Sequence, residues 1–154
     1  MNERVGSLDG AGRRFAIVVS RFNEVVTEEL TAGALEAFTT HGVSPEEIEI
    51  VRVPGAFELP GACARVIERG GVDGIVALGC VIRGETPHFD FVAGETTRGL
   101  GELARESKLS FGFGLLTTET LEQALVRAGS GSENKGWEAA LTALEMANLY
   151  GTLR

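Results

Sequence analysis

The chain has few of the residues that staple small proteins or bind metals in them. Its 154 residues include two cysteines, two histidines, one tryptophan and one tyrosine. Cys63 lies in a helical apolar pattern and Cys80 ends an apolar run, so both are interpreted as small core residues and not as a disulfide. Two histidines and two cysteines spread this widely do not form a metal site, and no metal is expected. A chain of this length can bury a core without such staples.

Long apolar runs are also missing. No stretch approaches the roughly 20 residues of a membrane span, and residues 1–12 are polar and glycine-rich, without the apolar segment of a signal peptide. A cytoplasmic enzyme or binding domain is therefore expected. The formal net charge of -8 argues against nucleic acid and anionic membranes as partners. An anionic substrate would need a local positive site that works against this field.

The sequence does contain a regular alternation of two apolar patterns. Short β-branched runs predict buried strands, and apolar residues at a spacing of three to four predict helices. Strands are predicted at 15–19, 48–53, 74–82 and 111–116, and helices at 26–38, 59–67, 89–103, 120–128 and from 137 onward. Gly70 and Gly71 stop the second helix, and Thr120 with Gln123 fits a capping box at the start of the fourth.

This order predicts an α/β protein with a three-layer αβα, flavodoxin-like arrangement, in which helices flank a four-stranded parallel sheet. Because no repeat or linker divides the chain, residues 1–154 are expected to form a single domain. Ser130–Ser132 is interpreted as a kink between the last two helices. Residues 1–12 have no helical period and are expected to form an extended N-terminal arm, either disordered or paired as a strand with a neighbouring subunit.

Three loops predicted at one sheet edge carry charge together with an aromatic ring. They are residues 20–23, 54–58 and 83–89, at the carboxyl ends of strands, where open parallel sheets bind ligands. Phe22 and Phe57 could each fold back onto the core, which is the commoner fate of a lone phenylalanine. Two aromatic rings at the same edge favour the other interpretation, a platform for a planar ring.

The turn Gly84–Pro87 precedes the third predicted helix. Thr86 is predicted to be the N-cap of this helix, and Pro87 suits its first turn. Free backbone N–H groups at such a turn favour an anion such as phosphate, although an ordinary capped helix start explains the same residues. In an anion site, the carboxylate of Glu85 would have to point outward.

His88 falls in the first turn of that helix, beside the predicted anion site. A histidine can transfer protons near neutral pH, whereas most lone histidines are structural or solvated. Arg127 and Lys135 are most simply explained as solvated cations near helix ends. No GxGxxG or Walker motif follows any strand, which argues against dinucleotide and nucleoside triphosphate binding.

Four segments, in order and at matching spacing, resemble the lumazine synthase family. They are Ser20–Asn23, Val53–Glu58, Gly84–Asp90 and Asn134–Ala140, and the resemblance runs from about Arg14 to the C-terminus. It implies the penultimate step of riboflavin biosynthesis, the condensation of 5-amino-6-(D-ribitylamino)uracil with 3,4-dihydroxy-2-butanone 4-phosphate. The products would be 6,7-dimethyl-8-ribityllumazine, phosphate and water. The resemblance implies no metal or redox cofactor.

Carried onto this chain, the family's site would contain one catalytic residue, His88, for proton transfer. The pyrimidine and its ribityl chain would be held by Phe22, Ala56, Phe57, Glu58, Val81, Ile82, Phe113 and Lys135, and the phosphate by Gly84, Glu85, Thr86 and Arg127. Phe113, Arg127 and Lys135 would come from the adjacent subunit. Glu138 would orient Lys135 or His88.

The resemblance also implies a homopentamer and, as a further assembly, a shell of sixty subunits. The short connection from Arg127 to Lys135 matches shell-forming members, although Ala128–Glu133 departs from the family's usual Thr-Lys-rich kink. Riboflavin synthase is a candidate partner inside such a shell. Two other functions fit the same fold: a flavin- or lumazine-binding module without catalysis, and a structural shell protein with a vestigial site.

Overall fold

A four-stranded parallel sheet in the order β2-β1-β3-β4 forms the centre of the molecule. The computed structural model describes all 154 residues. Its strands are β1 (Phe15–Ser20), β2 (Ile48–Val53), β3 (Gly74–Ile82) and β4 (Ser110–Thr118), and its helices are α1 (Glu24–Thr40), α2 (Leu59–Arg69), α3 (His88–Glu106), α4 (Leu121–Arg127) and α5 (Lys135–Thr152). Single turns of 3-10 helix lie at Pro45–Glu47, Ala56–Glu58 and Gly131–Glu133.

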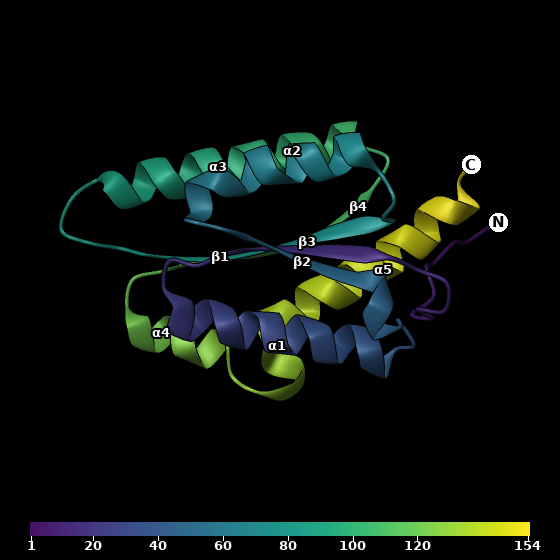
Figure 1. Cartoon of the computed structure of the whole chain (residues 1–154), viewed down its shortest axis with the longest axis horizontal. Coiled ribbons are helices and arrows are strands. Elements are labelled where there is room, and N and C mark those ends of the chain that lie inside the picture. Colours follow the sequence, from purple (N-terminus) through teal and green to yellow (C-terminus); the bar gives the residue numbers. More distant parts are fainter.

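Helices cover both faces of this sheet. Figure 1 shows α2 and α3 on one side and α1, α4 and α5 on the other. Every residue of β1 is buried because the strand is central and covered on both faces. Ile17 and Val19 pack toward α1 and α5, whereas Ala16 and Val18 pack toward α2. The predicted three-layer αβα fold is confirmed, and its strand order is that of flavodoxin-like proteins.

One predicted helix start is wrong and another is confirmed. The prediction that Thr86 caps α3 is wrong, because the helix begins at His88 with Pro87 at the N-cap position and no side-chain cap. The carbonyl of Pro87 accepts the N–H groups of Asp90 and Phe91, so the first helical turn closes one residue later than predicted. The capping box of α4 is confirmed, since Thr120 and Gln123 each bond the other's backbone N–H.

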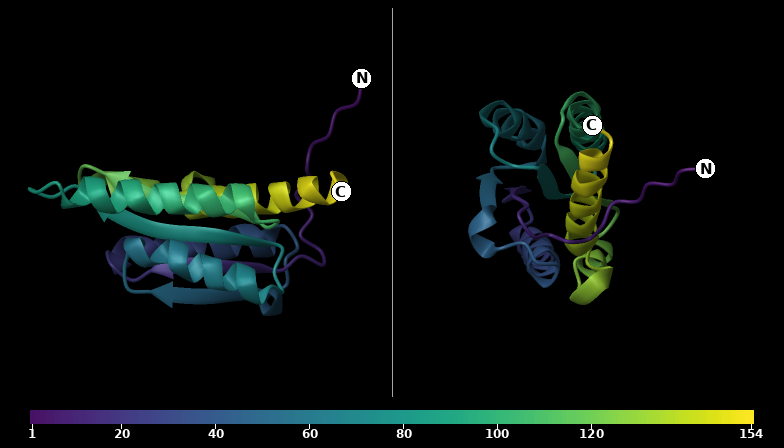
Figure 2. Two further views of the ribbon diagram at one scale, coloured as in Figure 1. Left: turned by 90° about the horizontal axis from the view of Figure 1, so that it is seen from above. Right: turned by 90° about the vertical axis from the view of Figure 1, so that its right-hand side faces the viewer.

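The N-terminal residues run along the C-terminal helix before they leave the molecule. The Asn148 side chain on α5 donates to the carbonyls of Ser7 at 2.8 Å and Asp9 at 3.1 Å. Gly6 lies so close to α5 that a Cβ there would come within 1.9 Å of the Glu145 carbonyl oxygen. Figure 2 shows the first few residues projecting away from the body. Pairing of residues 1–12 with a neighbouring subunit stays a prediction.

None of the helices has the length and apolar character of a membrane span.

One buried asparagine joins three helices. Asn134 is 2% exposed, and its amide oxygen caps α5 by accepting the N–H groups of Gly136 and Trp137. Its amide nitrogen donates to the carbonyl of Glu29 on α1 at 3.0 Å and to that of Ala128 after α4 at 3.1 Å. The side chain thereby fixes where α5 starts relative to α1 and α4.

We predict that Asn134→Ala lowers the free energy of unfolding by about 2–4 kcal/mol, because it removes a helix cap and leaves two carbonyls without their donor. Urea denaturation at fixed protein concentration measures the change. Ser132→Ala is the matched control, since Ser132 is exposed and its hydroxyl makes no hydrogen bond in the chain, and it should change the value by less than about 0.5 kcal/mol. Equal stabilities of the two variants would contradict the role given to Asn134.

Candidate active site

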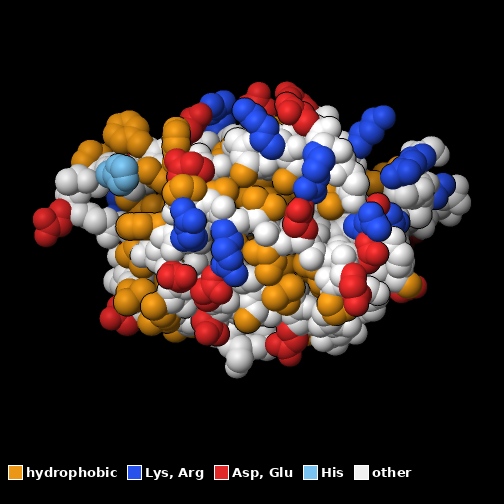
Figure 3. Space-filling model, viewed as in Figure 1, with side chains coloured by type: hydrophobic (Ala, Val, Ile, Leu, Met, Phe, Trp, Pro, Cys, Tyr) orange, Lys and Arg blue, Asp and Glu red, His pale blue; other side chains and the backbone are white.

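A cavity of about 700 Å³ opens at the carboxyl edge of the sheet. Nine of the residues predicted for the site line it: Phe22, Ala56, Phe57, Glu58, Val81, Ile82, Gly84, Thr86 and His88. Gly55, Cys80, Phe89, Phe91 and Val92 complete the lining. Hydrophobic side chains gather on the surface at this end of the molecule, where α3 begins (Figure 3). The three loops singled out in the sequence therefore meet in one place.

Aromatic rings at the mouth of this cavity point to solvent and away from the core. Phe22 is 69% exposed and Phe57 is 59% exposed, so neither folds back onto the core. Phe91 is 73% exposed and was not predicted. Its spacing of three residues from His88 on one helix was the available signal, since residues three apart share a helix face. The rings offer apolar faces to a planar ligand.

The loop that carries Phe22 is tied to both neighbouring strands. Its backbone N–H groups at Arg21 and Phe22 donate to the carbonyls of Val53 and Pro54. Asn23 adopts the left-handed conformation, with φ at 62°, and its side-chain amide donates to the carbonyl of Cys80 on β3 at 2.8 Å. The conformation turns the chain from β1 into α1, and the hydrogen bond holds that turn against the cavity.

The loop after β3 has the features of an anion site. The backbone N–H groups of Gly84, Glu85 and Thr86 donate to no acceptor in the chain, and they precede the positive end of the α3 dipole. Glu85 is exposed and does not line the cavity, as an anion site requires. His88 is the first residue of α3 and lines the cavity, within the same short segment.

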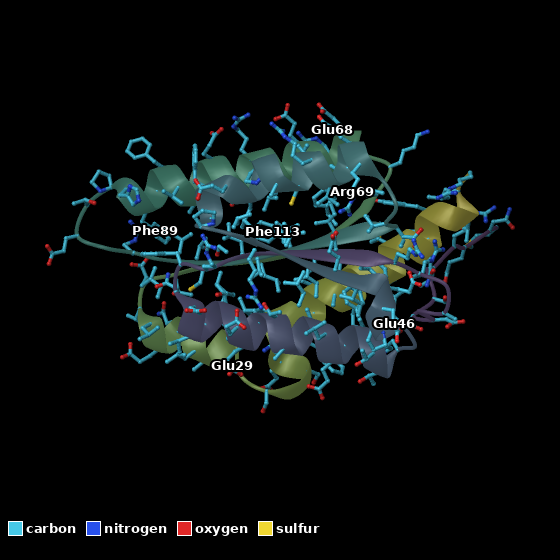
Figure 4. The ribbon with its side chains drawn as sticks, in the orientation of Figure 1. Glu29, Glu46, Glu68, Arg69, Phe89 and Phe113 are labelled. Atoms are coloured by element: carbon cyan, nitrogen blue, oxygen red, sulfur yellow. The ribbon has the colours of Figure 1, made fainter.

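Four residues predicted for the site lie elsewhere in the chain. Phe113 on β4 lines a separate groove against α3, and Figure 4 shows it well apart from Phe89. Arg127 ends α4 and donates to the carbonyl of Gln123 at 2.9 Å. Lys135 and Glu138 form an ion pair of 2.8 Å on the first turn of α5. None of the four lines the cavity of its own chain, and the supply of Phe113, Arg127 and Lys135 by an adjacent subunit stays a prediction.

A second cavity, of about 330 Å³, lies at the opposite edge of the sheet, where Figure 4 places Glu46 and Arg69. Its arginines are already paired: Arg14 with Glu47, and Arg69 with Glu49 at 2.8 Å. The pair with Arg69 holds the pKa of Glu49 below its usual value through a hydrogen bond from the guanidinium. A further cavity, of about 810 Å³, lies between the ends of α3 and α5 and is lined mainly by polar and charged residues. Of these three cavities, only the one at the carboxyl edge gathers several aromatic rings, and it is therefore the candidate active site.

The two cysteine thiols are poor nucleophiles near neutral pH. Burial raises the pKa of the Cys63 thiol to about 12 and that of the Cys80 thiol to about 11, so both stay protonated near neutral pH. No group of three or more histidine, cysteine, aspartate or glutamate side chains is placed to hold a metal ion. The groups that the cavity offers a ligand are the His88 imidazole, the Glu58 carboxylate, aromatic rings, backbone amides and the Thr86 hydroxyl.

The fold and the cavity define a three-layer α/β protein with an aromatic-lined cavity at the carboxyl edge of its sheet. Residues 12–151 match the family model described as 6,7-dimethyl-8-ribityllumazine synthase. Curated proteins of that name are similar over nearly the whole chain: one from Chlorobaculum tepidum is 50% identical over 96% of both chains, and one from Chlorobium phaeobacteroides is 50% identical over 94% of both. A third, from Chlorobium limicola, is 49% identical over 94% of both. The chain belongs to the 6,7-dimethyl-8-ribityllumazine synthase family.

The turn at Asn23 gives a prediction that separates backbone strain from hydrogen bonding. Both Asn23→Gly and Asn23→Ala lose the hydrogen bond to the carbonyl of Cys80. Glycine adopts the left-handed conformation without strain, whereas alanine adopts it only with strain. We expect Asn23→Ala to be less stable than Asn23→Gly by about 1 kcal/mol. Chemical denaturation of both variants at one protein concentration measures this difference. An alanine variant as stable as the glycine variant would show that the strain is absent in solution.

Proposed function

We propose that the chain condenses 5-amino-6-(D-ribitylamino)uracil with 3,4-dihydroxy-2-butanone 4-phosphate, and so forms 6,7-dimethyl-8-ribityllumazine with release of phosphate and water. The observation that carries the proposal is the single cavity in which aromatic rings, His88 and unpaired backbone N–H groups converge. Membership of the family supports the same reaction. This reaction is the penultimate step of riboflavin biosynthesis, and we expect it to take place in the cytoplasm.

The pyrimidine lies against Phe22 in this proposal. The edge of the ring meets the backbone of Val81 and Ile82 at the end of β3, and the ribityl chain extends along Ala56, Phe57 and Glu58. The carboxylate of Glu58 is exposed at the cavity and can accept from ribityl hydroxyls. The backbone groups of β3 suit the edge of a pyrimidine, which alternates hydrogen-bond donors and acceptors. The carboxylate of Glu58 suits a chain that carries hydroxyls.

The phosphate of the second substrate binds at the loop Gly84–Thr86. Free N–H groups and the Thr86 hydroxyl donate to it, and Arg127 of the adjacent subunit pairs with its charge. Lys135 and Phe113 of that subunit complete the pyrimidine site, with Glu138 orienting Lys135 through their ion pair. A local cation is needed because the chain as a whole carries a net charge of -8.

Alignment of two bound substrates does most of the work of catalysis. The amine of the pyrimidine is already nucleophilic, so it attacks the ketone without help from a serine or cysteine, and a carbinolamine and then an imine follow. His88 moves the proton that leaves carbon as phosphate is eliminated, and the ring then closes. Holding two reactants in register can lower a barrier by about 7–11 kcal/mol in favourable cases, and an acid–base residue adds roughly 10²–10⁴-fold.

We infer that the complete site requires a ring of subunits, a homopentamer. Phe113, Arg127 and Lys135 are solvent-facing in the single chain and lie outside its own cavity. Apolar side chains around them are unusually open: Val126 is 73% exposed and Leu121 is 47% exposed. The short 128–134 connection supports further assembly into a sixty-subunit shell, in which riboflavin synthase is a candidate guest. In either assembly the extended N-terminal arm can add a strand to a neighbour's sheet.

Two alternatives predict other results. A flavin- or lumazine-binding module would bind product without forming it, and a structural shell protein would assemble without a working site. Neither needs a proton-transfer residue in the cavity, where His88 lies. Both alternatives are therefore less well supported than the enzyme.

Turnover tests this proposal. Wild-type protein mixed with both substrates should form fluorescent product. His88→Ala should lower kcat by roughly 10²-fold, at the low end for acid–base catalysis because the amine needs no activation. Arg127→Ala should raise KM for the butanone phosphate by about 10- to 100-fold through loss of a charge-assisted hydrogen bond. Arg65→Ala, on an exposed part of α2, is the control and should resemble wild type. If folded and assembled wild-type protein formed no product, the proposed enzymatic activity would be refuted.

Mixed oligomers test whether neighbours share a site. The double variant Phe22→Ala/Glu58→Ala damages the half of the site that a chain keeps, and Arg127→Ala damages the half that it donates. Co-assembly of the two should restore more activity than either has alone, because some interfaces then combine two intact halves. The comparison is with the same variants assembled separately and mixed afterwards. Equal activity of the two mixtures would mean that each chain builds its site alone.

A further inference from the structure

Arg83 lies at the boundary between β3 and the loop Gly84–Pro87 and contacts two other segments, the end of β4 with Glu119 and the beginning of α3. The register of the sheet pairs Ile82 with Thr118, so the next residues, Arg83 and Glu119, leave the sheet side by side. The backbone N–H of Arg83 continues this pairing by donating to the carbonyl of Thr118 at 2.8 Å. The side chain is 39% exposed and remains at the surface of the molecule, next to the cavity.

The guanidinium of Arg83 reaches across the loop to the beginning of α3. It lies 4.5 Å from the centre of the Phe89 ring and 3.2 Å from the carboxylate of Asp90. Its Nε also donates to Glu119 at 3.0 Å. The backbone of residues 84–87 connects Arg83 to the beginning of α3, and the contacts of the Arg83 side chain connect the same two points directly. The loop is thus closed at its base. Such closure reduces the number of conformations open to the loop.

The charge of Arg83 is not free to attract a ligand. Two carboxylates, Asp90 and Glu119, share the one guanidinium, and their hydrogen bonds to it raise its pKa. The local sum of these three groups is negative, so the cluster as a whole does not favour an anion electrostatically. Any benefit of Arg83 to anion binding must therefore come from the geometry that it imposes on the loop.

We propose that Arg83 is a positioning residue for the phosphate group of the substrate, which acts by closing the loop Gly84–Pro87 so that its backbone N–H groups and His88 keep fixed places. This inference rests on the proposed function. Arg83 does not touch the substrate in this arrangement. The Phe89 ring that it covers lines the cavity, so the same contact also sets the wall beneath the ligand.

The test is a comparison of KM values. Arg83→Gln should raise KM for the butanone phosphate by about 5- to 20-fold and leave KM for the pyrimidine within about twofold. Arg83→Lys, which keeps the charge but not the planar fork, should recover part of the loss. Arg98→Gln is the matched control, because Arg98 is an exposed arginine of α3 that also contacts two carboxylates, Glu95 and Glu102. It should leave both KM values unchanged.

Removing a carboxylate separates positioning from charge. Asp90→Asn and Glu119→Gln weaken the closure but make the site less negative. If Arg83 acts by positioning, both variants should raise KM for the butanone phosphate. A lower KM in these variants, equal changes in both KM values for Arg83→Gln, or values like those of Arg98→Gln would overturn the inference. Should Arg83→Gln fail to assemble, Glu119→Gln gives the decisive comparison.

A probe other than turnover distinguishes failure of the inference from failure of the proposed function. Inorganic phosphate should raise the Tm of the wild type and of Arg98→Gln, and raise that of Arg83→Gln less at the same concentration. Absence of turnover in a wild type that phosphate stabilises would count against the condensation reaction alone. Normal turnover, with phosphate stabilising Arg83→Gln as much as wild type, would count against Arg83 alone.

Discussion

Parallel pairing of the four strands is the constraint on which the rest of the molecule depends. Because all four strands point the same way, the loops that follow them leave at one edge of the sheet. The register then sets which loops are neighbours: Ser20 pairs with Val53, and Ile82 pairs with Thr118. Residues about 30 positions apart in sequence are thereby placed around one cavity. The opposite edge holds the ion pairs of Arg14 and Arg69 beside further cations near the ends of α3 and α5, and no comparable wall of rings.

Hydrogen bonds from polar side chains to the backbone convert this arrangement into fixed geometry. Asn23 bonds the carbonyl of Cys80 across the sheet edge, and Asn134 bonds carbonyls after α4 and on α1 while capping α5. Asn23 therefore fixes the position of the adjacent Phe22, and Asn134 fixes that of the adjacent Lys135. Both neighbours take part in the proposed reaction. A charged residue, Arg83, has the same kind of role at the third loop. Function at this edge depends on residues that need never meet a substrate.

In the proposed function the single chain is an incomplete unit. Its cavity holds an aromatic platform, a histidine and free N–H groups, but it contains no cation to balance a phosphate. The cations and the covering ring that are proposed to complete it lie on β4, α4 and α5, beside exposed apolar side chains. Association would bury that apolar surface and complete the electrostatics of the site in one step, which couples assembly to activity.

Local patterns in the sequence determined the elements and their order. The continuous apolar run of β1, the double glycine after α2 and the pairing of Thr120 with Gln123 each have a local physical cause, so each could be predicted. Seven of the nine predicted residues that line the cavity lie in loops that could be identified from the carboxyl ends of parallel strands, whereas Val81 and Ile82 were named through the family resemblance alone. The left-handed turn at Asn23 and the start of α3 at His88 could not be predicted, since they depend on a carbonyl of another strand and on how the loop packs. Only the tertiary structure decided that Arg83 reaches Phe89, Asp90 and Glu119 together, because contacts between strands follow from register and packing, which no local pattern records.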